Sequence, residues 1–285
     1  MNICRYISGT AEGVRIGLVE DSEIADLSAA GIGSLTDVLE SADPLQMLRA
    51  AGETAVRRVP MSDVILRPPL EGQEVWAAGV TYLRSKTARM EESDFSATAY
   101  DRVYDADRPE IFFKALPEKV VAPGEAVGIR RDAKWNVPEP ELALVINPAL
   151  ELIGFTVGND MSSRDIEGEN LLYLPQAKVY DRSCALGPHI VVGTTETEAR
   201  EWTIRITILR GGRPAFSGET SVGKLKRTFS ELAQYLFRCQ SFQRGAVLLT
   251  GTGIVPPDVF TLQEHDIVEI EIPAIGVLRN SVVVV

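Results

Sequence analysis

The stretches Glu139-Pro-Glu-Leu-Ala-Leu-Val-Ile146 and Leu152-Ile-Gly-Phe-Thr-Val-Gly-Asn-Asp160 decide the fold of this chain. Each contains a short apolar run typical of a buried β-strand. Because only a few residues separate the two runs, we expect neighbouring strands of one sheet. Side chains two positions apart in a strand project to the same side, which brings Glu139 and Glu141 together. Asp160 ends the second strand and is expected beside them.

This group of carboxylates predicts a cation site. Like charges so close together repel unless they are protonated, solvated or bridged by a cation, and hard divalent ions prefer oxygen ligands. Less specific interpretations remain. A Glu-X-Glu motif also fits a solvated strand edge. Asp160 or Ser162 fits the cap of a short helix, which the spacing of Ser162 and Asp165 indicates.

Many strands and few helices are predicted along the rest of the chain. Gly211-Gly212 has the sequence of a two-residue hairpin turn. Apolar residues at helical spacing indicate one longer helix, Lys224–Cys239. Because strands outnumber helices, the fold class is α+β with a large mixed or antiparallel sheet. The additional strands are expected at residues 75–80, 189–192, 202–209, 247–250 and 267–272.

A domain boundary is predicted near Pro69. Before it, short apolar runs alternate with turn signals as in a small β-meander, and a helical pattern over residues 34–49 is interrupted at Asp43-Pro44. After it, a new apolar stretch begins at Val75. We therefore expect a small β-rich N-terminal domain, residues 1–69, and a second domain, residues 70–285.

Composition argues against several classes of function. The 285 residues carry a formal net charge of −11, and no basic patch offsets it. Such a chain repels phosphate backbones and anionic lipids, so we expect neither nucleic acid nor a membrane as a partner. No signal peptide and no membrane-spanning run is recognised. The three cysteines form no disulfide or zinc pattern, so the expected compartment is cytoplasmic.

Further segments carry candidate chemistry. Lys178 follows an apolar, Pro-broken loop, where desolvation favours a role in proton transfer. Glu110 precedes the apolar pair Phe112-Phe113, a setting that suits a general acid. The glycines of Thr250-Gly-Thr-Gly253 permit close approach of a substrate carboxylate, although the same sequence fits an ordinary turn. The long polar segment 82–104 is predicted to be a mobile lid.

In these motifs the sequence resembles the fumarylacetoacetate hydrolase superfamily. The similarity rests on Glu139-Pro-Glu141, Gly158-Asn-Asp-Met-Ser-Ser-Arg-Asp165 and Thr250-Gly-Thr-Gly253, in the order and spacing of the family. Within the superfamily it is greatest to the 2-keto-3-deoxy-D-arabinonate dehydratase branch. That closer likeness rests on Trp135 and on segments 103–106, 108–115, 138–143 and 169–178.

The resemblance implies a mixed β-sheet roll with short helices, assembled into homodimers or homotetramers. It implies that Glu139, Glu141 and Asp160 bind Mg²⁺, with Mn²⁺ or Ca²⁺ as alternatives. Lys178 and Glu110 would reach a small 2-keto acid substrate. The remaining candidate substrate contacts are Thr252, which would hold the substrate carboxylate, and Tyr82, Arg84 and Lys86 of the lid.

The implied activity is metal-dependent dehydration of a 2-keto-3-deoxy sugar acid, such as a pentonate that would yield 2,5-dioxopentanoate, in non-phosphorylated sugar catabolism. The superfamily's C–C hydrolases activate water with a His-Glu pair whose histidine follows a tyrosine corresponding to Tyr82. Residues 83–88 include no histidine, which favours dehydration over hydrolysis of a 2,4-diketo acid to pyruvate. A catalytically inert, metal-stabilised binding module is a further alternative, against which Lys178 and Glu110 argue.

Overall fold

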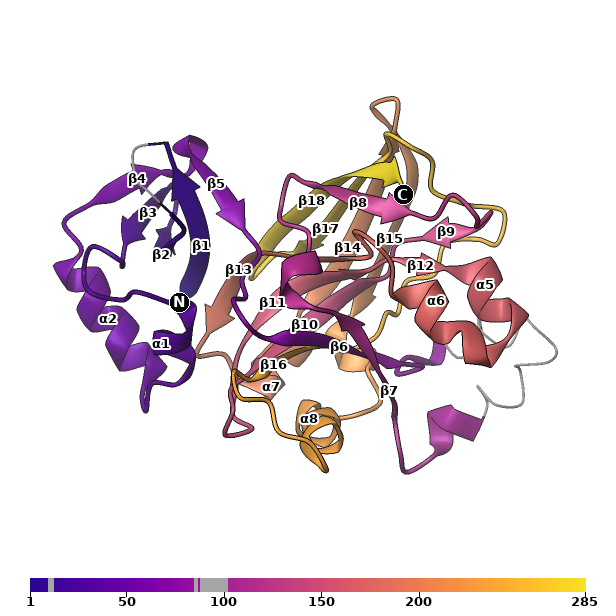
Figure 1. The fold of residues 1–285 in the computed structure, drawn as a ribbon, viewed down its shortest axis with the longest axis horizontal. Helices are drawn as coiled ribbons and strands as arrows, with labels where there is room; N and C mark the ends of the chain where they lie inside the picture. Colours follow the sequence, from indigo (N-terminus) through magenta and orange to yellow (C-terminus); the bar gives the residue numbers. More distant parts are fainter. Residues whose placement is uncertain (10–12, 85–86, 88–101) are drawn as a thin grey trace.

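The computed structural model describes residues 1–9, 13–84, 87 and 102–285, and in this part of the chain two large β-sheets pack together (Figure 1). The larger sheet joins, in spatial order, β4 (Arg58–Pro60), β3 (Glu23–Asp26), β2 (Arg15–Glu20), β1 (Asn2–Ser8), β13 (Cys184–Val192), β11 (Leu152–Asp160), β10 (Pro140–Ile146), β16 (Ala246–Leu249), β6 (Glu74–Gly79) and β7 (Glu110–Ala115), with β5 (Val64–Arg67) beside β1. The smaller sheet joins β15 (Arg213–Ser221), β14 (Thr203–Arg210), β17 (Ile267–Ile272), β18 (Gly276–Val284) and β8 (Ala126–Ile129). A short ladder pairs β12 (Ser162–Ser163) with β9 (Asn136–Val137).

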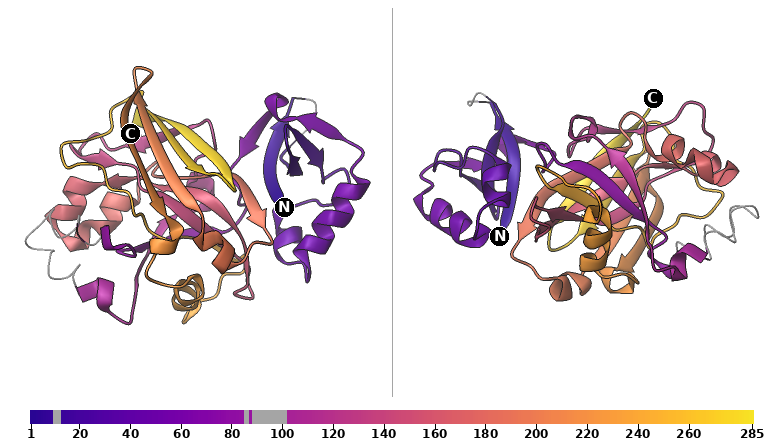
Figure 2. Two further views of the ribbon diagram at one scale, coloured as in Figure 1. Left: turned by 180° about the vertical axis from the view of Figure 1, so that it is seen from behind. Right: turned by 60° about the horizontal axis from the view of Figure 1, so that its bottom comes forward.

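Short helices lie around these sheets. Figures 1 and 2 show α1 and α2 with the N-terminal strands, and α5 and α6 at the opposite end of the molecule. Within the described residues, no helix is long and apolar enough to cross a membrane. The helices are α1 (Leu35–Leu39), α2 (Pro44–Thr54), α5 (Arg164–Glu169), α6 (Leu174–Lys178), α7 (Glu196–Arg200) and α8 (Phe229–Phe237), with 3₁₀ turns at Met61–Asp63, Pro117–Lys119, Leu171–Tyr173 and Val222–Lys224.

The core lies between the two sheets. Leu142 of β10 and Phe155 of β11 belong to the same apolar cluster as Ile206 of β14 and Ile270 of β17. Leu232 of α8 joins this cluster. Every residue of β10 and β13 is buried, as expected for central strands that are covered on both faces.

The predicted α+β class with a large mixed sheet is confirmed, because most strand pairs are antiparallel while β16–β6 and β18–β8 are parallel. The Gly211-Gly212 turn is also confirmed, since both glycines have positive φ, at 57° and 76°. The predicted helix Lys224–Cys239 begins later than expected, because α8 starts at Phe229. The side chain of Thr228 caps α8 by accepting from the N–H of Glu231, and the preceding residues form a separate 3₁₀ turn.

The N-terminal strands are continuous with the larger sheet. β1 pairs with β13 through Asn2–Val191 and Ile3–Ile190. A second apolar cluster unites N-terminal residues such as Leu18 with Ile190 and with Val145 of β10. The predicted division at Pro69 stays a prediction. The sheet and the second cluster both cross that boundary.

This shared cluster should contribute to the stability of the whole chain. Ile190 is 0% exposed, and Ile190→Ala should lower the free energy of unfolding by about 2–5 kcal/mol through lost burial and the cavity left behind. Urea denaturation measures the change. As a control, Val56→Ala should change it by less than about 0.5 kcal/mol, since Val56 is 95% exposed. Equal effects of the two substitutions would contradict this account of the core.

Candidate metal centre and active site

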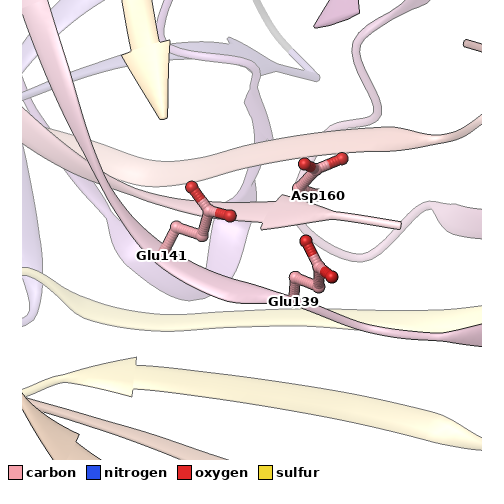
Figure 3. A group of neighbouring side chains, drawn as sticks. All are labelled: Glu139, Glu141 and Asp160. Carbon is pink, nitrogen blue, oxygen red and sulfur yellow. The ribbon is translucent and has the colours of Figure 1, made fainter. Parts of the chain in front are cut away.

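Strand pairing brings the three predicted carboxylates together. Glu139 immediately precedes β10, Glu141 lies within it, and Asp160 ends the antiparallel partner β11. The N–H of Asp160 donates to the carbonyl oxygen of Glu139 over 3.0 Å. Carboxylate oxygens of the three residues lie within 4.8 Å of one another, and all three side chains are buried (Figure 3). The predicted clustering of the three carboxylates is therefore confirmed. The alternative of a solvated strand edge is excluded, because the side chains are buried.

Two of these carboxylates are neutralised by ion pairs. Glu139 accepts from Arg164 over 2.7 Å and from the Lys178 ammonium over 2.6 Å. Lys178 also lies 3.0 Å from Oδ2 of Asp160. Oδ1 of Asp160 faces a second buried ammonium, that of Lys114, at 2.5 Å. Ion pairs of this kind reduce the cost of burying carboxylates.

Glu141 is compensated differently. Its Oε2 accepts a hydrogen bond from the N–H of Gly251 over 2.6 Å. Burial, followed by repulsion from Asp160 and Glu139, raises the pKa of Glu141 well above its usual range, and the charge of Lys178 opposes the rise. A divalent cation among the three carboxylates would relieve this repulsion. The all-oxygen donor set therefore fits a hard ion such as Mg²⁺.

The loop that supplies this hydrogen bond requires glycine. Gly251 has φ +94°, and a Cβ there would lie 2.0 Å from Oγ1 of Thr81. The next residue, Thr252, is buried, and its hydroxyl exchanges hydrogen bonds with the backbone of Ile254. The conformation of the loop thus places Thr252 beside the carboxylates.

A small cavity lies over the carboxylates. Three predicted site residues outside the triad line it: Lys178 at the end of α6, Glu110 at the start of β7, and Thr252. The ammonium of Lys178 lies 5.6 Å from the ring centre of Phe112, so an aromatic face borders it. Besides these residues and the three carboxylates, the described lining consists of Ala78, Gly79, Val80, Glu167 and Gly251.

Of the predicted lid contacts, Tyr82 and Arg84 do not line the cavity, and Lys86 lies outside the described residues. Tyr82 is buried in the main apolar cluster and is absent from the described lining. Burial and the nearby charge of Glu141 raise the pKa of its hydroxyl. Arg84 is exposed. Lys86 and most of the segment 82–104 lie outside the described residues, so the lid and these three contacts stay predictions.

Several site residues were missed by the sequence interpretation. Strand alternation from Glu110 could have found Phe112 and Lys114, because residues two apart share a face of β7. The alternative that Ser162 caps a short helix was wrong. The cap position of α5 is Ser163, whose side chain makes no capping bond, while the hydroxyl of Ser162 accepts from Lys178 over 2.6 Å. Ser162 thus serves as a buried hydrogen-bond acceptor for Lys178 and does not cap the helix.

Both histidines of the chain lie in its described part, and neither lines the cavity. His189 is buried in β13, where burial lowers its pKa to about 4. His265 is exposed in the loop before β17. The cavity therefore has no imidazole base in the described residues.

The raised pKa of Glu141 predicts a pH-dependent response to Mg²⁺. Below that pKa the carboxyl is protonated and binds the ion weakly. Above it the ionised carboxylate destabilises the metal-free fold, and Mg²⁺ offsets this cost. The rise in Tm caused by Mg²⁺ should therefore grow as the pH rises through this raised pKa. The stabilisation free energy should approach roughly 3 kcal/mol at about 100 times the Kd. Differential scanning fluorimetry measures it.

The matched variant is Glu141→Gln, which keeps the shape of the side chain and removes its charge. It should be more stable than the parent protein without Mg²⁺ at pH 8 and should gain little from the ion at any pH. Equal, pH-independent gains in both proteins would contradict a role of Glu141 in binding the cation.

Comparisons with known proteins agree with this geometry. The family model described as the fumarylacetoacetate (FAA) hydrolase C-terminal domain matches residues 74–283. A probable 2-keto-3-deoxyxylonate dehydratase of Haloferax volcanii is 50% identical over 217 residues, which are 76% of this chain and 74% of the relative. A 2-dehydro-3-deoxy-D-arabinonate dehydratase of Saccharolobus solfataricus is 40% identical over 233 residues, covering 81% and 78% of the two chains.

Among solved structures, a 2-keto-3-deoxy-D-arabinonate dehydratase complexed with magnesium and 2,5-dioxopentanoate superimposes with a TM-score of 0.80. The two proteins are 34% identical, and the match covers 100% of this chain and 99% of the other. The fold, the order of the motifs and the buried carboxylates thus agree with one family. This chain belongs to the fumarylacetoacetate hydrolase family.

Proposed function

We propose that this protein is a Mg²⁺-dependent dehydratase that converts a 2-keto-3-deoxy-D-pentonate to 2,5-dioxopentanoate in non-phosphorylated sugar catabolism. The observation that carries the proposal is the meeting of three buried carboxylates, Lys178 and Glu110 around one cavity. The names of the relatives support the substrate class. The two sugar acids in those names are one compound, because C4 is the only stereocentre left in a 2-keto-3-deoxy-D-pentonate.

Glu139, Glu141 and Asp160 would hold the ion. The chemistry that Mg²⁺ supplies when bound is Lewis-acid polarisation of the 2-keto group, which makes the C3 protons of the substrate more acidic. The cluster would attract the ion because the ion pairs neutralise Glu139 and Asp160 but leave the charge of Glu141 under-compensated. Thr252, which lines the cavity, would hold the carboxylate of the substrate.

Lys178 and Glu110 would move the protons. Lys178 reaches the carboxylate cluster from α6. As the neutral amine it would remove a C3 proton, and as the ammonium it would stabilise the enolate. Glu110 lines the same cavity from β7 and would donate a proton to the departing C4 hydroxyl. The reverse assignment uses the same geometry, so the order of the roles is a question for experiment.

The described cavity favours dehydration over hydrolysis of a 2,4-diketo acid. Hydrolysis requires a base that activates water, and neither histidine of the chain lines the cavity. Elimination needs no external water. The buried Lys178 and the half-buried Glu110 supply the two proton-transfer groups that it requires.

Incubation of the protein with Mg²⁺ and 2-keto-3-deoxy-D-pentonate should give a product lighter by one water, detected by mass spectrometry. The same preparation should leave 2,4-diketo acids intact, and chelation of the ion with EDTA should abolish turnover. Release of pyruvate together with a second acid would contradict the proposal in favour of a C–C hydrolase.

Exchange of C3 protons with solvent separates the roles of Lys178 and Glu110. The unreactive analogue 2-oxobutyrate has C3 protons but no C4 hydroxyl, so NMR in D₂O reports proton removal alone. If Lys178 is the base, Lys178→Met should slow both exchange and dehydration by at least about 100-fold. Glu110→Gln should slow dehydration by a similar factor and leave exchange unchanged. The opposite pattern would exchange the two roles.

Two further properties belong to this proposal. We propose a homodimer or homotetramer, which light scattering coupled to gel filtration would measure. We also propose a cytoplasmic location, which is supported by the free state of all three cysteines, two of them buried.

A further inference from the structure

The proposed product requires more proton transfers than dehydration alone. Loss of water across C3 and C4 leaves a C3=C4 double bond conjugated to the keto group, and a hydroxyl on C5. In 2,5-dioxopentanoate, C5 is instead an aldehyde and C3 is again a methylene. The two compounds are isomers, so no oxidant takes part. A proton must leave C5, and protons must be added at C3 and C4.

The cavity contains a carboxyl group that the dehydration step does not use. Glu167 lies on α5, is only 3% exposed, and lines the same cavity as Lys178 and Glu110. It does not belong to the carboxylate triad. A buried glutamate in the wall of a polar cavity is uncommon without a function.

The helix that carries Glu167 is anchored to the triad. Arg164, three residues earlier, pairs with Glu139 over 2.7 Å. Residues three apart lie on the same side of a helix, so the side of α5 that faces the triad also presents Glu167. Glu110 approaches from β7, a different element of the fold. Glu110 and Glu167, the two carboxyl groups outside the triad, thus line the cavity from different secondary-structure elements, β7 and α5.

We propose that Glu167 is a catalytic residue that removes the C5 proton after water has been lost, an inference that rests on the proposed function. The C5–H bond breaks and its proton goes to the Glu167 carboxylate. Its electron pair forms C4=C5, and the former C3=C4 pair moves to C2–C3, giving a dienolate. Protonation at C3 gives the C5 enol. Addition of a proton at C4 and loss of the enol hydroxyl proton to solvent complete the aldehyde.

The enone 5-hydroxy-2-oxopent-3-enoate gives a direct test. In Glu167→Gln, water loss should proceed within about threefold of the parent rate, while the isomerisation should be at least about 100-fold slower, the lower range of general base catalysis. The variant should therefore accumulate the enone, detected by its vinyl protons in NMR and by the ultraviolet absorbance of the conjugated ketone. Mass spectrometry alone cannot distinguish the two isomers.

Two variants and one added substrate make the test specific. Glu169→Gln, on the same helix but exposed, should behave like the parent protein. Glu167→Asp keeps a carboxylate and should recover part of the isomerisation. Synthetic enone supplied to the parent protein should be converted to the aldehyde directly, and at least about 100-fold more slowly by Glu167→Gln.

Each other result would overturn the assignment. If Glu167→Gln forms the aldehyde at the parent rate, Glu110 or Lys178 performs both transfers. If a folded Glu167→Gln that still gains stability from Mg²⁺ loses no water, Glu167 acts in the first step instead. Failure of the parent protein to lose water would remove the proposed function and this inference together, and is recognised by the absence of both isomers.

Discussion

The need to balance buried charge governs the architecture around the cavity. Three carboxylates within 4.8 Å would be prohibitively repulsive in a water-poor interior without nearby cations. Each cation comes from a different element, so strand pairing, helix placement and side-chain packing must all be correct before the charges balance. Within the described residues, the side chains that pair with the triad are Lys114 of β7, Arg164 of α5 and Lys178 of α6.

The same balance explains why Glu141 differs from its neighbours. Glu139 and Asp160 have ion pairs, whereas Glu141 receives a backbone N–H and has a raised pKa. The protein thus leaves one carboxylate under-compensated at the centre of the cluster. A divalent ion can supply the positive charge that Glu141 lacks. A site of buried oxygen ligands can therefore still bind metal.

The sequence was sufficient for the part of the site that follows from strand geometry. The Glu139-Pro-Glu141 spacing and the end of the next strand at Asp160 determine the cluster, because alternation and pairing are local rules. Alternation could place Lys114 on the face of β7 that carries Glu110, but the pairing of Lys114 and Arg164 with the triad could not be found in this way. Their function depends on which strands and helices meet in space, and a buried lysine looks in sequence like any surface lysine. The misassigned cap at Ser162 has the same origin, since its competing partner, Lys178, is sixteen residues away.

The pairing of β1 with β13 has a consequence for the catalytic sheet itself. β13 is hydrogen-bonded on its other side to β11, the strand that ends in Asp160, and β1 covers the edge of β13 at Ile190 and Val191, at the end remote from Asp160. Unpaired edges of this kind recruit strands from other chains. The N-terminal strand β1 therefore protects this edge of the sheet from pairing with other chains. A chain without its N-terminal strands would expose this edge of β13, a strand that is otherwise fully buried, to self-association.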